Sequence, residues 1–322
     1  PIKTQIIDEN EFLKAACCNL SESFETNPSV DVNFTDAVTG TKQIQMLGLA
    51  GPYAQITQEN MPYARGLASM FGLPFIPSTW VESLQLNKGT GSVVNGYESI
   101  AGQINIELQK PENSDLLYLN GYGNAMGRYE FNANSAFSIN EKWHTGILTH
   151  TELNKQKNDV NDDGFLDAPL RRDFIAMNRW RYQDVESGLR SQFGAKIVMR
   201  ENTGGQTSQP AFSPQPEQGI WGLNMQNNRF EAFGKIGKVY NDKPWKSFGW
   251  QNSYSYHEQN AFMGLNAYEA EQQTFYSNFI YQSIIGNTNH RIKAGASFLY
   301  DELNEDLSLN RGTLDTSFYR SE

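Results

Sequence analysis

The stretch of sequence that decides the fold is WVESLQLNKGTGSVVNGYESIAGQINI, residues 80–106. Its glycines have two separate physical uses. Gly89, Gly91 and Gly96 allow tight reversals of the chain, because glycine adopts positive φ angles without the steric cost that a Cβ atom brings. Gly102 allows another segment of backbone to approach closely. The stretch therefore predicts tight turns and close backbone packing within a small domain.

The residues around this stretch predict a mixed α/β domain over residues 1–112. Asp8–Phe24 has apolar residues at helical spacing, and Pro77–Leu84 is expected to form a short helix with Pro77 in its first turn. Strands and a turn are expected at Gln43–Leu49, Tyr53–Thr57 and Glu59–Pro62. A hairpin of an unrelated soluble α/β domain is the alternative interpretation of this region.

From about residue 115 onward, apolar and polar residues alternate with a period of two, which indicates β-strands. In one such run, Phe248, Trp250, Tyr254 and Tyr256 fall on one face, with Asn252 between them. Similar apolar faces occur around residues 129–139, 174–182 and 292–300. These strands are longer than usual globular strands and suit a tilted crossing of a bilayer. On this pattern alone, a soluble β-sandwich that binds glycans is the alternative.

The connections between these strands alternate between short and long. Short turns are expected after Ile139, Asp184, Tyr240 and Ile285. Long loops are expected at about 155–172, 201–219 and 259–266. Outer-membrane β-barrels show this alternation, with the short turns on the periplasmic side.

The stretch at residues 80–106 resembles the plug-domain signature of TonB-dependent outer-membrane receptors. The positions that match it, which the resemblance marks as structural, are Glu82, Lys88, Gly89, Gly96, Ala101, Gly102, Ile104 and Asn105. Asn95 replaces the usual tyrosine, and Ser83 stands where arginine is common. The sequence of residues 49–66 is similar to that of receptors of Bacteroidota-type bacteria.

The resemblance implies an α+β plug domain over residues 1–112, followed by antiparallel transmembrane β-barrel strands over residues 113–322. A complete barrel of this kind has about 22 strands with a plugged lumen. The sequence provides about nine of them. We therefore expect a partial barrel and a much longer native polypeptide, because an open sheet leaves its edges without hydrogen bonds in lipid.

Composition and motifs exclude several functional classes. The formal net charge is −10, whereas nucleic-acid-binding proteins carry clustered basic residues. There is no Gly-x-Ser-x-Gly elbow, no P-loop and no zinc-protease motif, so the protein is not expected to be an enzyme. No apolar run approaches the length of a membrane-spanning helix.

The resemblance implies energised import across the bacterial outer membrane, driven by the TonB protein. The expected substrate is scarce: a metal chelate, a siderophore or a cobalamin-like molecule. One alternative is a receptor-like barrel that recruits other outer-membrane proteins and transports nothing. Another is a glycan importer that works with a surface lipoprotein as its lid. Outer-membrane lipid and TonB are the expected partners.

Two groups of residues are candidates for metal binding. Asp159, Asn161, Asp163 and Asp167 have the spacing of a calcium loop, with Gly164 at its sixth position. The glutamate usual at position twelve is replaced by Leu170, and an acidic, turn-rich loop explains the same residues. Cys17 and Cys18 are neighbours on the expected first helix; they are candidates for a soft metal such as copper or for burial as small apolar side chains.

Overall fold

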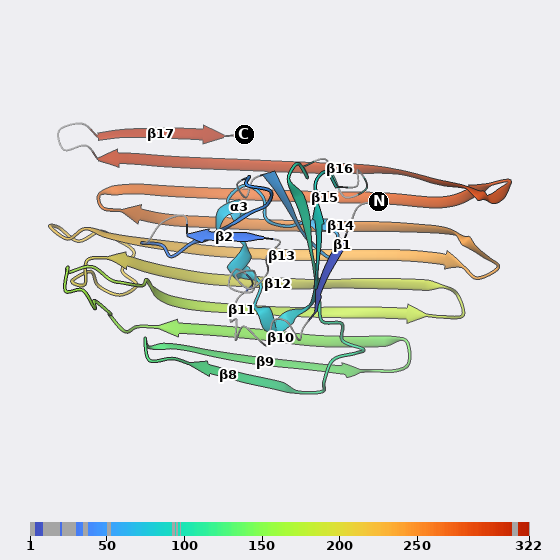
Figure 1. The fold of residues 1–322 in the computed structure, drawn as a ribbon, viewed down its shortest axis with the longest axis horizontal. Helices are drawn as coiled ribbons and strands as arrows, with labels where there is room; N and C mark the ends of the chain where they lie inside the picture. Colours follow the sequence, from blue (N-terminus) through green and yellow to red (C-terminus); the bar gives the residue numbers. More distant parts are fainter. Residues whose placement is uncertain are drawn as a thin grey trace.

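The computed structural model describes residues 4–8, 20, 30–34, 38–49, 53–91, 94, 96, 98–310 and 315–321. A compact N-terminal unit lies along one face of a wide antiparallel sheet (Figure 1). The predicted helix over Asp8–Phe24 and both cysteines lie outside the described residues, apart from single positions. Among the described residues, no helix is long and apolar enough to cross a membrane.

The N-terminal unit, which we call the plug, is built on a five-stranded sheet. In spatial order its strands are β1 (Thr4–Asp8), β6 (Val81–Lys88), β7 (Gly102–Leu108), β4 (Ala54–Gln58) and β5 (Met61–Pro62). β4 pairs with β7 in parallel, and the other pairs are antiparallel. A separate hairpin joins β2 (Asp31–Phe34) to β3 (Lys42–Gln45). The deciding stretch thus supplies two adjacent central strands of the plug sheet.

The short helix predicted over Pro77–Leu84 is wrong in extent. A 3-10 turn, η4, covers only Ser78–Trp80, and β6 begins at Val81. The physical reason is burial: Trp80 and Leu84 are fully buried, and the alternating residues of Val81–Lys88 pair with β1 on one side and β7 on the other. Two further short helical segments precede it, α3 (Ala68–Phe71) and η3 (Leu73–Phe75).

The large sheet, which we call the barrel wall, has ten strands joined in sequence order. They are β8 (Tyr118–Gly123), β9 (Arg128–Ser138), β10 (Trp143–Asn154), β11 (Leu170–Asp184), β12 (Leu189–Gly205), β13 (Gly222–Tyr240), β14 (Lys243–Met263), β15 (Asn266–Ile285), β16 (Asn287–Asn310) and β17 (Asp315–Ser321). This is the predicted partial barrel, with one strand more than the approximate count from sequence. The seven-residue β17 is short and mostly polar, which is why alternation alone did not reveal it.

The connections follow the predicted rhythm with one exception. Short turns lie after β9, β11, β13 and β15, and long loops follow β10 and β12. The long loop expected at 259–266 is absent, because β14 runs to Met263 and β15 begins at Asn266. Its polar residues continue the ladder, with Asn260 opposite Glu269. The polar residues at 259–266 therefore form the ends of two strands beyond the apolar belt, and they do not form a loop.

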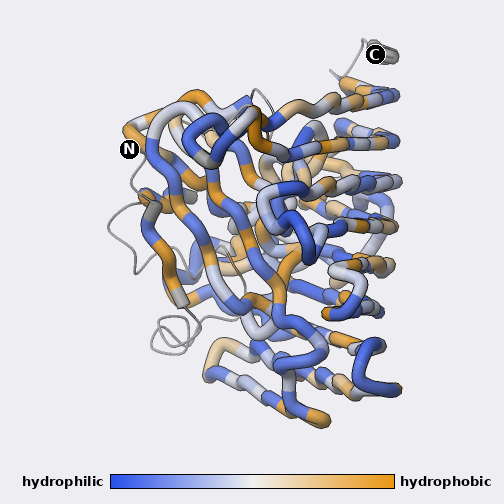
Figure 2. Tube along the Cα trace, turned by 90° about the vertical axis from the view of Figure 1, so that its right-hand side faces the viewer, coloured by the Kyte–Doolittle hydropathy of each residue, from blue (hydrophilic) through white to orange (hydrophobic). Residues whose placement is uncertain are grey.

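The two faces of the barrel wall differ, as the alternation predicts. Aromatic residues on the outer face, such as Phe131, Trp250 and Phe298, are half exposed. The inner face meets the plug, and its apolar residues Ile175, Met177 and Val198 belong to the same buried cluster as Trp80 and Ile104. Figure 2 shows the plug beside the stacked strands, with hydrophilic and hydrophobic positions alternating along the chain. The outer face therefore carries an apolar belt of the kind that outer-membrane barrels present to lipid.

Gly102 packs where the sequence predicts close approach. A Cβ atom at this position would lie 2.5 Å from Met46 Cε and 2.7 Å from the carbonyl oxygen of Asn87. Replacing Gly102 with alanine is expected to destabilise the plug by about 1–3 kcal/mol, because overpacking displaces a neighbouring strand. Hydrogen–deuterium exchange of the β6 and β7 amides measures this loss. Gly249→Ala is the matched control, since a Cβ there meets nothing within 4 Å; equal exchange in both variants would contradict the prediction.

Candidate functional site: the plug–barrel interface

The tip of the β4–β5 hairpin makes a buried contact with the barrel wall. Glu59 and Asn60 connect the two strands and both have left-handed backbones, with φ of 50° and 63°. Hairpin turns of this kind usually carry Asn-Gly, since glycine adopts positive φ without strain. Glu59 is nevertheless almost fully buried. Its unfavourable backbone is therefore maintained by the contacts of its side chain.

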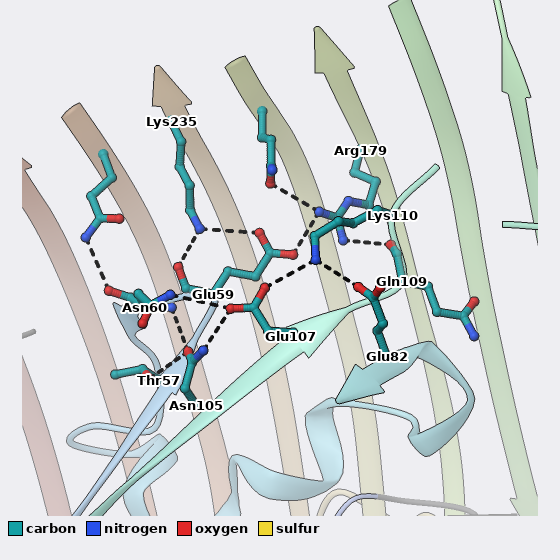
Figure 3. A network of polar contacts seen from close by, with 12 residues as sticks. Thr57, Glu59, Asn60, Glu82, Asn105, Glu107, Gln109, Lys110, Arg179 and Lys235 are labelled. Carbon is teal, nitrogen blue, oxygen red and sulfur yellow. Dashed lines mark hydrogen bonds and ion pairs between the residues drawn. The ribbon is translucent and has the colours of Figure 1, made fainter. Parts of the chain in front are cut away.

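Two basic residues of the barrel wall converge on Glu59 (Figure 3). Arg179 on β11 approaches Glu59 Oε1 through Nη2 at 2.8 Å, and Lys235 on β13 approaches Oε2 through Nζ at 3.4 Å. Lys235 also donates to the carbonyl oxygen of Glu59, and Arg179 Nη1 donates to the carbonyl oxygen of Gln109 at 2.9 Å. One carboxylate thus joins two strands of the wall to the plug.

The pKa of the Glu59 carboxyl reflects this surrounding. Burial by itself raises the pKa, since a low dielectric disfavours the charged form. The charges of Arg179 and Lys235 and their hydrogen bonds outweigh burial, so that the pKa lies below its usual value. Glu59 is therefore ionised and paired at neutral pH.

Residues of the deciding stretch extend this network into the plug. Asn105 Oδ1 accepts hydrogen bonds from the Asn60 backbone N–H at 2.7 Å and from Thr57 Oγ1 at 2.9 Å, while its Nδ2 donates to Glu107 at 2.8 Å. Lys110 lies 2.8 Å from Glu82 and 3.6 Å from Glu107. Burial lowers the pKa of Lys110, but hydrogen bonding and the nearby carboxylates raise it overall.

The other signature residues lie in the plug, outside this hydrogen-bond network. Ala101 and Ile104 are buried, and Lys88 is exposed at the end of β6. Gly89 and Gly96 have left-handed backbones, with φ of 86° and 110°. The structure thus brings Glu82 and Asn105 together at the interface and distributes the remaining signature residues through the turns and core.

A second buried contact lies beside the first, around Tyr63. Lys196 Nζ on β12 donates to the Tyr63 hydroxyl at 2.9 Å and lies 2.8 Å from Glu231 on β13. Arg229 Nε pairs with the same Glu231 carboxylate at 2.6 Å. Burial raises the pKa of Tyr63 well above its usual value, so the hydroxyl stays neutral and accepts this bond.

Further polar contacts reach the plug from wall strands on either side of the Glu59 contact. They are Thr79 Oγ1 to Asn132 Oδ1 at 3.1 Å, Gln251 Nε2 to the carbonyl oxygen of Asn60 at 3.2 Å, the Leu67 backbone N–H to Gln272 Oε1 at 3.0 Å, and Asn278 Nδ2 to the carbonyl oxygen of Val94 at 3.0 Å. The plug is thus positioned by contacts distributed from β9 to β15.

Sequence reasoning did not identify Glu59, Arg179, Lys196 or Lys235 as interface residues. A signal was present: Arg179 lies opposite the aromatic face of its strand, where the alternation directs it inward. A charged residue in the middle of a long strand and facing inward needs a partner there, because burying an unpaired charge is costly. The identity of that partner is not encoded locally.

The candidate calcium loop is an ordered turn in this structure. Asp159 accepts the backbone N–H groups of Asp163 at 3.1 Å and Gly164 at 2.9 Å, and Asp167 accepts that of Val160 at 2.8 Å. Asn161 donates to Asp163 at 2.9 Å. Within the described part of the chain, no three His, Cys, Asp or Glu residues are grouped to hold a metal. Calcium binding stays a prediction, as does a soft metal at Cys17 and Cys18, which lie outside the described residues.

Comparison with known proteins decides the family. Residues 1–103 match the family model of the TonB-dependent receptor plug domain. Over residues 1–103 the chain is a TonB-dependent receptor plug domain. The matched residues make up most of the plug, the barrel wall follows them in the chain, and this family belongs to the outer membrane of bacteria. Its members are receptors and transporters and not enzymes.

Solved structures share the fold of this chain. They include the receptor FpvA of P. aeruginosa bound to a pyoverdine–iron complex (TM-score 0.77, 11% identity, covering 99% of this chain and 44% of FpvA). The siderophore receptor PiuA of Acinetobacter baumannii (0.73, 10%, 98% and 48%) and the copper transporter OprC (0.72, 14%, 98% and 48%) are also similar. The chain thus spans slightly less than half of these proteins. No curated protein matches it in sequence.

Removing the charge of Glu59 is expected to loosen the plug. Glu59→Gln leaves Arg179 and Lys235 buried without a carboxylate, and breaking a buried ion pair costs about 3–5 kcal/mol. Hydrogen–deuterium exchange of β4 and β7 in the full-length protein measures the loss. Glu82→Gln is the control: its pair with Lys110 is partly exposed, so the expected loss is about 0–1 kcal/mol. Equal effects of the two substitutions would contradict the role of Glu59.

The same carboxyl predicts how the plug responds to acid. Because the folded-state pKa of Glu59 is lowered, its stabilising contribution is complete above the ordinary glutamate value of about 4.3. The contribution is lost as the pH falls through the lower, folded-state pKa. The protection of the plug amides, taken relative to the intrinsic exchange rate at each pH, is therefore expected to fall in acid more steeply in the natural protein than in Glu59→Gln. Identical acid profiles would refute this assignment.

Proposed function

We propose that the full-length protein imports a scarce substrate across the bacterial outer membrane, with energy supplied through TonB. A metal chelate, a siderophore or a cobalamin-like molecule is the expected substrate class. Structures with this fold include a receptor bound to a pyoverdine–iron complex and a copper transporter, which supports a metal-containing cargo.

The observation that carries the proposal is the nature of the plug–barrel contacts. Glu59 and Tyr63 are fixed by charged and polar groups of the wall, and the neighbouring contacts are hydrogen bonds. Buried ion pairs fix position well, but their net stabilisation is small compared with their attraction, since both partners regain hydration when separated. A plug held in this way has a defined resting position and can still be displaced once water enters the interface.

The plug sheet also offers a place for a pulling force to act. β1 lies at the edge of the sheet and pairs only with β6 there, from Thr4 opposite Asn87 to Asp8 opposite Ser83. A force applied to the chain before β1 acts on β1 first and reaches the rest of the sheet through its pairing with β6.

Locking the plug to the wall tests the proposal. Thr79→Cys with Asn132→Cys joins a plug side chain to a wall side chain that already meet at 3.1 Å, in a background with Cys17 and Cys18 replaced by serine. Uptake of ferric siderophores, copper and cobalamin by cells is measured with and without reductant, and mass spectrometry verifies the disulfide. We expect at least a tenfold loss of uptake of the one transported cargo when oxidised and recovery on reduction.

Two controls make the outcome decisive. Each single cysteine variant keeps uptake under oxidation, and deletion of TonB abolishes it in every variant. Undiminished uptake with the verified disulfide would overturn plug displacement. Absence of uptake for all cargo classes, together with stable co-purification of other outer-membrane proteins, would favour an assembly role instead.

A further inference from the structure

The outer face of the barrel wall carries an unusual pair of lysines at the end with the short turns. Lys238 lies near the end of β13 and Lys246 near the start of β14, on either side of the turn at residues 241–242. In an outer-membrane barrel this is the periplasmic end. Both lysines are half-buried, whereas Lys243 in the same hairpin is exposed.

Strand register directs these lysines toward lipid. Ile236 pairs with Trp250, and both are exposed on the apolar belt. Lys238 pairs with Phe248 two residues further along, on the same face of the sheet. Two residues advance a strand by about 7 Å. The ammonium of Lys238 is therefore just beyond the belt, at the level where lipid headgroups begin.

Both lysines are directed to one aromatic ring. Lys238 Nζ lies 5.4 Å from the centroid of the Tyr240 ring, and Lys246 Nζ lies 5.1 Å from it. Each contact is favourable as a cation–π interaction, but two like charges so close to one ring repel each other. Among the described residues, neither lysine forms an ion pair with a carboxylate within 4 Å. Positive charge is thus concentrated here with no carboxylate of the described residues in ion-pair contact with it.

Another lysine at the same end behaves differently. Lys142, in the turn after β9, pairs with Asp184 at 3.1 Å. A neighbouring aromatic group, Trp143 with Tyr182 and Phe193, lies on the outer face beside it. The lysine is neutralised within the protein at one turn, while at the other the positive charges stay together. The difference points to a ligand of opposite charge at Tyr240.

We propose that Lys238, Tyr240 and Lys246 bind the phosphate of an anionic glycerophospholipid in the periplasmic leaflet. The two ammonium groups supply hydrogen-bond donors and charge for the phosphodiester. The tyrosine ring suits the membrane interface, where amphipathic rings lie at headgroup level. The acyl chains would then follow the belt over Phe248 and Phe279, whose rings stack at 6.4 Å. The apolar belt continues directly from the basic group, which is why a lipid and not a free anion is the ligand.

Native mass spectrometry of the full-length protein tests this inference. The protein is released from detergent micelles that contain equal amounts of phosphatidylglycerol and phosphatidylethanolamine, and bound lipids are counted. We expect the natural protein to retain phosphatidylglycerol several-fold over phosphatidylethanolamine. Lys238→Gln with Lys246→Gln is expected to abolish that preference. Tyr240→Phe keeps the ring and the preference, whereas Tyr240→Ala reduces it.

Lys142→Gln is the matched control, since it removes one positive charge from the same rim without touching Tyr240. The inference is overturned if the double variant keeps the preference, if Lys142→Gln removes it equally, or if the natural protein shows none. Displacement of phosphatidylglycerol by inorganic phosphate would assign the site to a soluble anion and refute the lipid. The inference depends on the barrel lying in the membrane and not on transport, so its failure leaves the proposed import untouched.

Discussion

The structure depends on one buried carboxylate, that of Glu59, held between Arg179 and Lys235. A buried charge is tolerated only when its partners are placed closely and its remaining atoms are hydrogen-bonded. Here the partners come from two strands of the barrel wall, so the requirement fixes both the depth of the plug and its rotation within the wall. The strained turn at Glu59 and Asn60 is tolerated for the same reason, because the side chain that needs the turn is also the one that is paired.

The contacts around this carboxylate share a physical character. Lys196, Tyr63 and Glu231 form a second buried polar group, and single hydrogen bonds connect the plug to strands from β9 to β15. Apolar residues of one buried cluster, among them Trp80, Ile175 and Val198, pack between these polar groups. Such an interface holds the plug in one specific position, while the free-energy cost of separating the plug from the wall stays moderate. The proposed displacement of the plug requires both properties, and a purely apolar interface would provide only the first.

The outer face of the same strands follows a different rule. The wall presents aromatic and aliphatic residues outward along most of its height, since lipid accepts them without cost. At the periplasmic end the pattern changes, and lysines appear beside Tyr240 where headgroups replace acyl chains. The two faces of β13 thus suit two different environments. Lys235 on the inner face neutralises a plug carboxylate, while Lys238 on the outer face is available to a phosphate.

The sequence by itself determined the family signature at residues 80–106, the two faces of the wall strands and most of the turns, because these are properties of adjacent residues with a fixed period. It did not determine that Val81–Lys88 is a strand from its first residue, since burial of Trp80 and Leu84 between neighbouring strands overrides a local helical start. Only the tertiary structure decided which inward-facing charged residue of the wall pairs with which residue of the plug. Arg179 lies 120 residues from Glu59 and Lys235 lies 176 residues from it. Pairing over such separations depends on strand register and on how deeply the plug sits, and no local pattern in the sequence contains either.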